Sequence, residues 1–120
     1  MGRVSAELGR RIYLDTNIVI TSEMTLVEAL VGPLETQNLA IQQTYRSFLT
    51  STATLVVSPV SRDILEEAAQ LRANTKLKLP DAIHLATAIR HQCDSFFTND
   101  DVFKSLNLPQ VRMLSDVDLT

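Results

Sequence analysis

Cysteine is almost absent from the sequence, and long apolar runs are missing altogether. Cys93 is the only cysteine, so the chain can form neither an internal disulfide framework nor a thiolate metal cluster. Any bound metal must therefore be held by oxygen ligands or by His84 and His91. No run approaches the roughly 18 apolar residues of a membrane span, and no charged-then-apolar segment heads the chain. We therefore expect a cytoplasmic protein with no membrane contact.

Positive charge is also scarce. The sequence has eleven Lys and Arg residues and fourteen Asp and Glu residues, which gives a formal net charge of −3. This balance argues against a protein that binds nucleic acid through bulk positive charge. Local contacts through small basic groups, such as Arg3, Arg10 and Arg11, stay open. A solvated surface is the simpler interpretation of these side chains.

The chain does contain an alternation of strand and helix patterns within 120 residues, a length suited to one domain with a real core. Short apolar or aromatic runs predict strands at 12–14, 55–57, 95–98 and 111–114. Helices are predicted from about Ser22 or Thr25 to Gly32-Pro33, from about Asn38 to Leu49, after an N-cap at Ser61, and from Pro80. This order predicts an α/β fold with a parallel sheet of about four strands and helices on its faces.

Four carboxylates fall where such a sheet would bring them to one edge. In a parallel α/β sheet, the carboxyl ends of the strands and the amino ends of the following helices share an edge, where ligands bind. Asp15 follows the first strand, Asp100 follows the strand at 95–98, Asp81 opens a helix behind Pro80, and Glu28 lies early in its helix. Helix capping is an alternative explanation for each acid except Asp15.

Electrostatic repulsion favours a metal ion among these acids. Two carboxylates about 4 Å apart repel by roughly 4 kcal/mol at an effective dielectric of 20, so four converging acids would cost much of a domain's stability. A divalent cation removes that cost. All-oxygen ligation points to Mg²⁺ or Mn²⁺ rather than Zn²⁺, and an ion of this kind seeks phosphate oxygens. Phosphoester hydrolysis is the chemistry that follows.

The segments "YLDTNIVI", "TLVEALVG", "LKLPDAIHLATA" and "FFTNDDVF" occur together in the order and setting of a known family. The chain resembles the PIN domain and is most similar to the VapC-type toxins of bacterial toxin–antitoxin pairs. The resemblance implies a three-layer α/β/α fold and a metal-dependent ribonuclease. It also implies that Asp15, Glu28, Asp81 and Asp100 are the catalytic and metal-binding acids, with Mg²⁺ or Mn²⁺ as cofactor. Asn17 and Thr98 match the polar residues that orient those acids, whereas a structural role is favoured for His84.

One departure from the family pattern affects the first connection. Family members place a helical segment and a second strand between the DTN turn and the helix with the second acid, but only Ile18 to Thr21 stand here. A parallel crossover needs a dozen or more residues, so we expect the second family strand to be shortened or missing. Either residues are deleted, or a stretch is absent between Ile20 and Thr21. Glu28 is then the acid whose placement is most affected.

The sequence thus predicts an N-terminal extension at 1–11 and a single PIN-like domain at 12–120. The expected function is an endoribonuclease toxin that acts on RNA, is inhibited by a cognate antitoxin, and is a candidate for homodimerisation. The alternative is a catalytically impaired PIN-like module that binds metal or RNA. A haloacid-dehalogenase-like phosphatase is disfavoured, because its motif requires a second Asp where this chain has Asn17.

Overall fold

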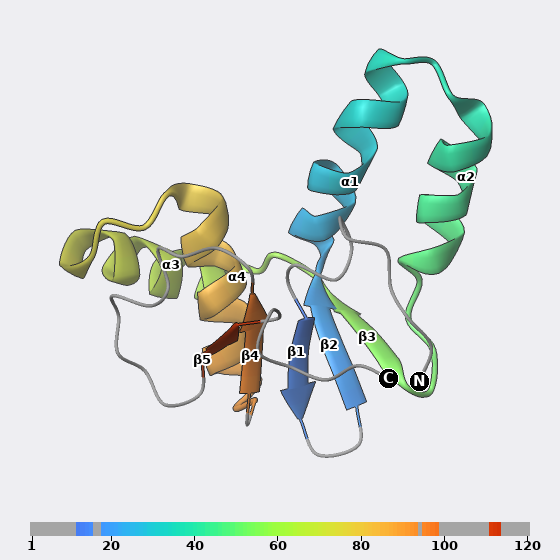
Figure 1. Ribbon diagram of the computed structural model, residues 1–120. Coiled ribbons are helices and arrows are strands. Elements are labelled where there is room, and N and C mark those ends of the chain that lie inside the picture. Colours follow the sequence, from blue (N-terminus) through green and yellow to red (C-terminus); the bar gives the residue numbers. More distant parts are fainter. Residues whose placement is uncertain (1–11, 16–17, 94, 99–110, 114–120) are drawn as a thin grey trace.

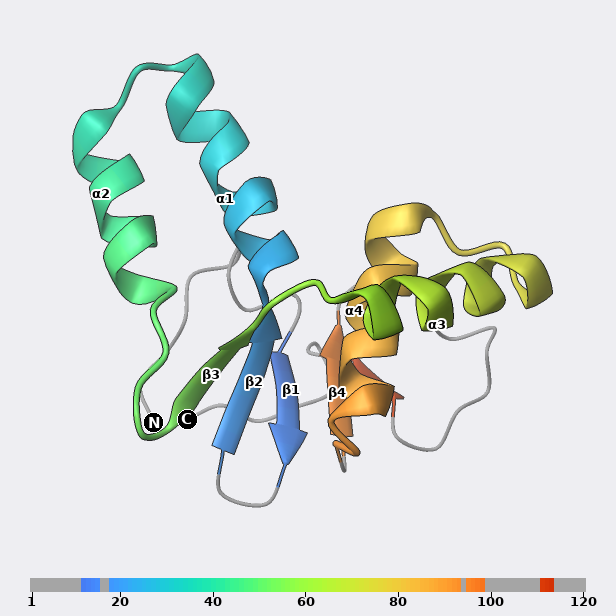
Figure 2. The ribbon, with the colours of Figure 1, turned by 180° about the vertical axis from the view of Figure 1, so that it is seen from behind.

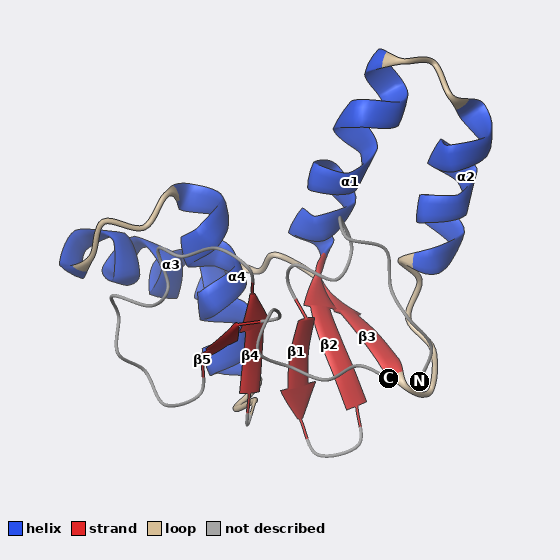
Figure 3. Cartoon of the chain, viewed as in Figure 1, coloured by secondary structure: helices blue, strands red, loops and turns tan. Residues whose placement is uncertain are grey.

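The computed structural model describes residues 12–15, 18–93, 95–98 and 111–113. The expected extension at 1–11 lies outside these ranges. The described residues form one sheet and four helices (Figures 1 and 3). In chain order the elements are β1 (Ile12–Asp15), β2 (Ile18–Ser22), α1 (Glu23–Glu35), α2 (Leu39–Phe48), β3 (Leu55–Ser58), α3 (Arg62–Asn74), α4 (Leu79–Arg90), β4 (Ser95–Thr98) and β5 (Val111–Met113).

The sheet has five strands in the order β3-β2-β1-β4-β5, and it is mixed rather than wholly parallel. Strand β2 is parallel to β3, and β4 is parallel to β5. Strand β1 runs antiparallel to both of its neighbours, as the opposed arrows in Figure 1 show. The α/β class predicted from the sequence is confirmed. The predicted parallel pairing is confirmed for β2 with β3 and for β4 with β5, but the prediction of a parallel sheet of about four strands is wrong for β1, which is antiparallel, and the sheet has five strands.

The short connection after β1 explains its direction. Asp15 pairs with Ile18, so only two residues separate the paired ends of β1 and β2. Two residues can join antiparallel strands but cannot make a parallel crossover. The expectation that the second strand would be shortened or missing is therefore wrong. A full strand forms at Ile18–Ser22, and it runs unbroken through Ile20 and Thr21.

Local hydrogen bonds set the helix ends. The Asn38 side chain caps α2 by accepting from the backbone N–H of Ile41, and Ser61 caps α3 through the N–H of Ile64, which confirms the predicted cap at Ser61. Helix α1, however, passes the expected stop at Gly32-Pro33 and ends at Glu35. Gln37 adopts a left-handed φ of 56°, and the N–H of the next residue bonds to the carbonyl of Pro33 at 2.8 Å. This Schellman-type closure ends the helix without a glycine.

Helix α4 forms the centre of the hydrophobic core. Every residue from Asp81 to Ala88 is buried, because α4 packs against the sheet on one side and against α3 on the other (Figure 2). Ala82 and Ala86 have no exposed surface, and such small side chains allow close packing. Ile20 of β2 and Phe96 of β4 belong to the same buried cluster. The core thus fixes α4 directly over the central strands.

Helices α1 and α2 form a hairpin that continues beyond the end of β2 and extends away from the sheet (Figures 1 and 2). A small second cluster, with Ala29 and Leu49 buried, holds the two helices together. Because this hairpin does not lie over the other face of the sheet, a three-layer arrangement is not seen among the described residues. None of the helices within these ranges is long and apolar enough to cross a bilayer.

Candidate active site

The end of β2 and the start of α1 form a compact polar junction. Ser22 is fully buried, and its side chain accepts a hydrogen bond from the N–H of Met24 at 3.0 Å. The hydroxyl groups of Thr21 and Thr25 are 2.8 Å apart and also buried. These bonds satisfy polar groups at the carboxyl end of the strand and fix the direction in which α1 leaves the sheet.

Glu28 lies in the second turn of α1, and its side chain is 37% exposed. His84 Nε2 donates to Glu28 Oε1 at 2.7 Å, across 56 residues of sequence. The histidine has no exposed surface, so this hydrogen bond joins an outer helix to the centre of the core. Glu28, whose placement the short connection was expected to affect most, is hydrogen-bonded to α4.

Asp81 lies in the first turn of α4 and is 6% exposed. A carboxylate at this position is favoured by the positive end of the helix dipole. His84 is three residues farther along the same helix, and residues at this spacing share one helix face with Cβ atoms about 5–6 Å apart. His84 thus contacts Glu28 of α1 and lies one helical turn from Asp81 on α4.

Asp15 is not brought to the edge of the sheet at which β2 ends. Its backbone pairs with Ile18, at the beginning of β2, whereas Glu28 follows the end of that strand at Ser22. The four residue-to-residue steps from Ile18 to Ser22 span about 13 Å at 3.3 Å per residue. The expectation that all four acids share one edge is therefore wrong for the backbone of Asp15, because the two-residue connection reverses β1.

The remaining predicted site residues lie partly outside the described residues. Asn17 and Asp100 fall outside them entirely. Thr98 is described through its backbone, which ends β4 at the same edge as Ser22 and pairs with Met113. Asp100 follows Thr98 by two residues in the sequence. The site roles of these three residues stay predictions.

The described carboxylates fit a divalent metal ion of the expected kind. Mg²⁺ in proteins is commonly held by one or two carboxylates, while waters and substrate phosphates complete its coordination. Glu28 and Asp81 offer such oxygen ligands from two separate helices. Within the described part of the chain, no three His, Cys, Asp or Glu side chains gather closely enough to hold an ion on their own. Further ligands would have to come from substrate, water or residues beyond these ranges.

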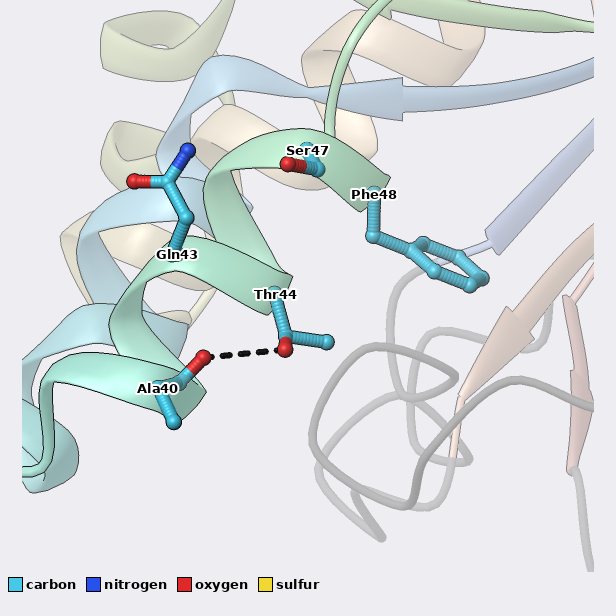
Figure 4. Close-up of a pocket in the computed structure, with 5 residues that line it drawn as sticks. All are labelled: Ala40, Gln43, Thr44, Ser47 and Phe48. Atoms are coloured by element: carbon cyan, nitrogen blue, oxygen red, sulfur yellow. Dashed lines mark hydrogen bonds between the residues drawn. The ribbon is translucent and has the colours of Figure 1, made fainter.

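A separate open hollow of about 520 Å³ lies along α2. Its lining consists of Ala40, Gln43, Thr44, Ser47 and Phe48 (Figure 4). The Thr44 hydroxyl donates to the carbonyl of Ala40 at 2.9 Å, as the dashed line shows. None of these five described side chains is titratable, so they supply no acid–base or metal-binding group.

The contact of His84 with Glu28 was not predicted from the sequence, which favoured a structural role for the histidine. The available signal was its spacing from Asp81, since residues three apart on a helix point the same way. That spacing shows that His84 lies beside the third acid of the motif. It carries no information about Glu28, which approaches from another helix.

The chain belongs to the PIN domain family, whose model matches residues 2–108. It is also similar to a solved structure described as a toxin–antitoxin complex from Klebsiella pneumoniae, with 34% sequence identity and a TM-score of 0.60. That similarity covers 76% of this chain and 69% of the other. No curated protein matches the chain. The match to the family model confirms the predicted family, while the VapC-type assignment stays a prediction. PIN domains are generally nucleases that use divalent metal ions.

Proposed function

We propose that this protein is a metal-dependent endoribonuclease that hydrolyses RNA phosphodiester bonds and is the toxin of a toxin–antitoxin pair. The observation that carries the proposal is the 2.7 Å bond of Glu28 to His84, a residue 56 positions away in the sequence and three residues after Asp81 on α4. Membership of a nuclease family and likeness to a toxin–antitoxin complex support it. The proposed partners are single-stranded RNA and a cognate antitoxin, with homodimerisation and a cytoplasmic location as further proposals.

In this proposal, Glu28 and Asp81 hold Mg²⁺ or Mn²⁺, and Asp100 completes the acidic set. When bound, a divalent ion lowers the pKa of a coordinated water and neutralises charge on a phosphodiester. Asp81 is the rigid acid, since its side chain is nearly buried at the start of the central helix. Glu28 is the more accessible acid, and its partly exposed carboxylate faces the solvent from which RNA arrives.

Cleavage of a labelled single-stranded RNA tests this function. We expect cleavage in the presence of Mn²⁺ or Mg²⁺ and its loss in excess EDTA, with recovery when metal is added back. A protein that cuts equally well in EDTA would not be a metal-dependent nuclease. A heat-denatured sample is the control for contaminating nucleases, which often survive heating.

Metal binding should also raise thermal stability. A ligand that binds only the folded state at 100 times its Kd stabilises that state by about 2.7 kcal/mol. For a domain of this size we expect the melting temperature to rise by roughly 10 °C under such conditions. Thermal melts with and without millimolar Mn²⁺ measure the change. The Asp81→Asn variant should lack it, and an equal rise in that variant would place the ion elsewhere.

Asp15 provides a test of the reversed strand. Because β1 carries its backbone to the other edge, we expect Asp15→Asn to change the RNA cleavage rate by less than about twofold, well below the tenfold that 1.4 kcal/mol represents. The measurement is cleavage under the same Mn²⁺ conditions, with Asp81→Asn assayed beside it. A loss as large as that of Asp81→Asn would return Asp15 to the metal set.

The reversed strand favours a second candidate function, a PIN-like module that binds metal or RNA without cutting. Displacement of one acid of four leaves fewer ligands to fix an ion and to orient a water. Such a module would bind RNA in a Mn²⁺-dependent manner in a gel-shift experiment while leaving it intact. Cleavage that depends on Asp81 would reject this candidate.

A further inference from the structure

His84 is the least accessible polar group of the candidate site. It has no exposed surface, and it lies in a helix whose residues are buried from Asp81 to Ala88. Buried polar side chains are nearly always hydrogen-bonded, because an unmet bond in the core costs about 1–3 kcal/mol. Here the ring nitrogen Nε2 of His84 is hydrogen-bonded to Glu28, whose carboxylate is partly exposed.

The contact with His84 links Glu28 to the buried core. Helix α1 belongs to a hairpin that extends away from the sheet, while α4 is packed on both sides. A glutamate side chain loses substantial rotamer freedom when it is fixed, by up to about 2 kcal/mol, so a defined orientation needs a partner. The 2.7 Å bond supplies one from α4, the most buried of the described helices.

We propose that His84 is a positioning residue, which holds Glu28 Oε1 so that the carboxylate is kept beside Asp81 for metal binding. This inference rests on the proposed function. His84 does not ligate the ion in this proposal, because the ring nitrogen Nε2 is engaged by the carboxylate. Loss of a hydrogen-bonding partner behind a metal ligand typically costs 10–100-fold in metal affinity or activity. An effect of that size separates positioning from packing alone.

Three variants separate the hydrogen bond from the packing of the ring. His84→Leu has a similar volume and no donor. His84→Gln keeps an N–H donor on a long side chain. Thr87→Val is the matched control: Thr87 is also fully buried on α4, one turn farther on, and its hydroxyl donates to Ile83 within the helix at 2.7 Å. Loss of that hydroxyl removes a buried hydrogen bond without touching Glu28.

The direct measurement is Mn²⁺ affinity of the RNA-free protein, read from the electron paramagnetic resonance signal of free Mn²⁺. We expect His84→Leu to weaken binding by about 10–100-fold, whereas His84→Gln recovers most of the affinity and Thr87→Val keeps the wild-type value. In RNA cleavage at fixed Mn²⁺, His84→Leu should lower kcat while leaving KM for RNA nearly unchanged. Circular dichroism verifies that each variant is folded.

Two results would overturn the proposal in distinguishable ways. If Asp81→Asn weakens Mn²⁺ binding but folded His84→Leu does not, the site exists and His84 does not position it. If neither substitution changes Mn²⁺ binding, both the metal site and the role of His84 fall. Should His84→Leu fail to fold, nitrogen-15 NMR of the wild-type protein decides. The Nε2 resonance of His84 must move on addition of Mg²⁺ and stay fixed in Asp81→Asn, and an unmoved wild-type resonance rejects the proposal.

Discussion

The Asp81→Asn variant should lose Mn²⁺-dependent RNA cleavage by at least about 100-fold. Asp81 is the more buried acid of the pair, with 6% of its surface exposed. Another flexible side chain cannot easily move into this buried position to replace the lost negative charge. A hundredfold loss corresponds to about 2.7 kcal/mol of transition-state stabilisation, which is within the several kcal/mol that a metal ion supplies. The measurement is the initial rate of cleavage of a single-stranded RNA at saturating Mn²⁺.

A matched substitution shows whether the loss is specific to the site. Asp63 opens α3 in the same way that Asp81 opens α4, yet its side chain is 70% exposed and pairs with Arg90 at 3.3 Å. Exposed pairs of this kind contribute about 0–1 kcal/mol, so Asp63→Asn should leave both fold and cleavage nearly unchanged. Cleavage by Asp81→Asn within threefold of wild type would remove Asp81 from the metal site.

The largest loss of stability is expected from Phe96→Ala. Phe96 is 1% exposed in the cluster between α4 and the sheet. Truncation of a buried phenylalanine to alanine typically costs about 3–5 kcal/mol, because transfer free energy is lost and a cavity remains. Domains of this size have about 5–15 kcal/mol in total, so the melting temperature should fall by roughly 12–20 °C. Urea unfolding followed by circular dichroism gives the free energy of unfolding.

Phe48→Ala is the matched control for that experiment. The same side chain is truncated, but Phe48 lies at the end of α2 and is 44% exposed. We expect a cost of less than about 1 kcal/mol, since exposed substitutions remove little buried area. Equal losses in the two variants would contradict the assignment of the core to the face of the sheet under α4.

The helices could be predicted from the sequence because their signals are local. The cap at Ser61 and the apolar pattern of α4 depend on neighbours within a few residues, and both predictions are confirmed. The end of α1 was predicted too early, at Gly32-Pro33. Gln37 supplies the left-handed residue of the closure instead of a glycine, and single-sequence patterns do not reveal this.

The arrangement of the acids was less predictable, because strand direction is a property of the whole sheet. The pattern of residues 12–14 shows a strand but does not show which way it runs. The short connection to Ile18 was recognised, yet its effect was assigned to Glu28. In the structure Glu28 lies against His84, and Asp15 is the residue carried away. Strand β1 lies between β2 and β4, and its two-residue connection to β2 makes it antiparallel to both.

Strand β1 also stands between the two parallel pairs, β3-β2 on one side and β4-β5 on the other. During synthesis on the ribosome, its partner on one side emerges at once, whereas β4 follows only after about 80 more residues. At 5–20 residues per second this delay is roughly 4–16 s. During that interval β4 (Ser95–Thr98) cannot yet pair with β1, so the edge of β1 that it covers in the folded protein is open. An open strand edge can pair with strands from other molecules. The position of β1 inside the sheet thus leaves one strand edge open to aggregation until β4 has been synthesised.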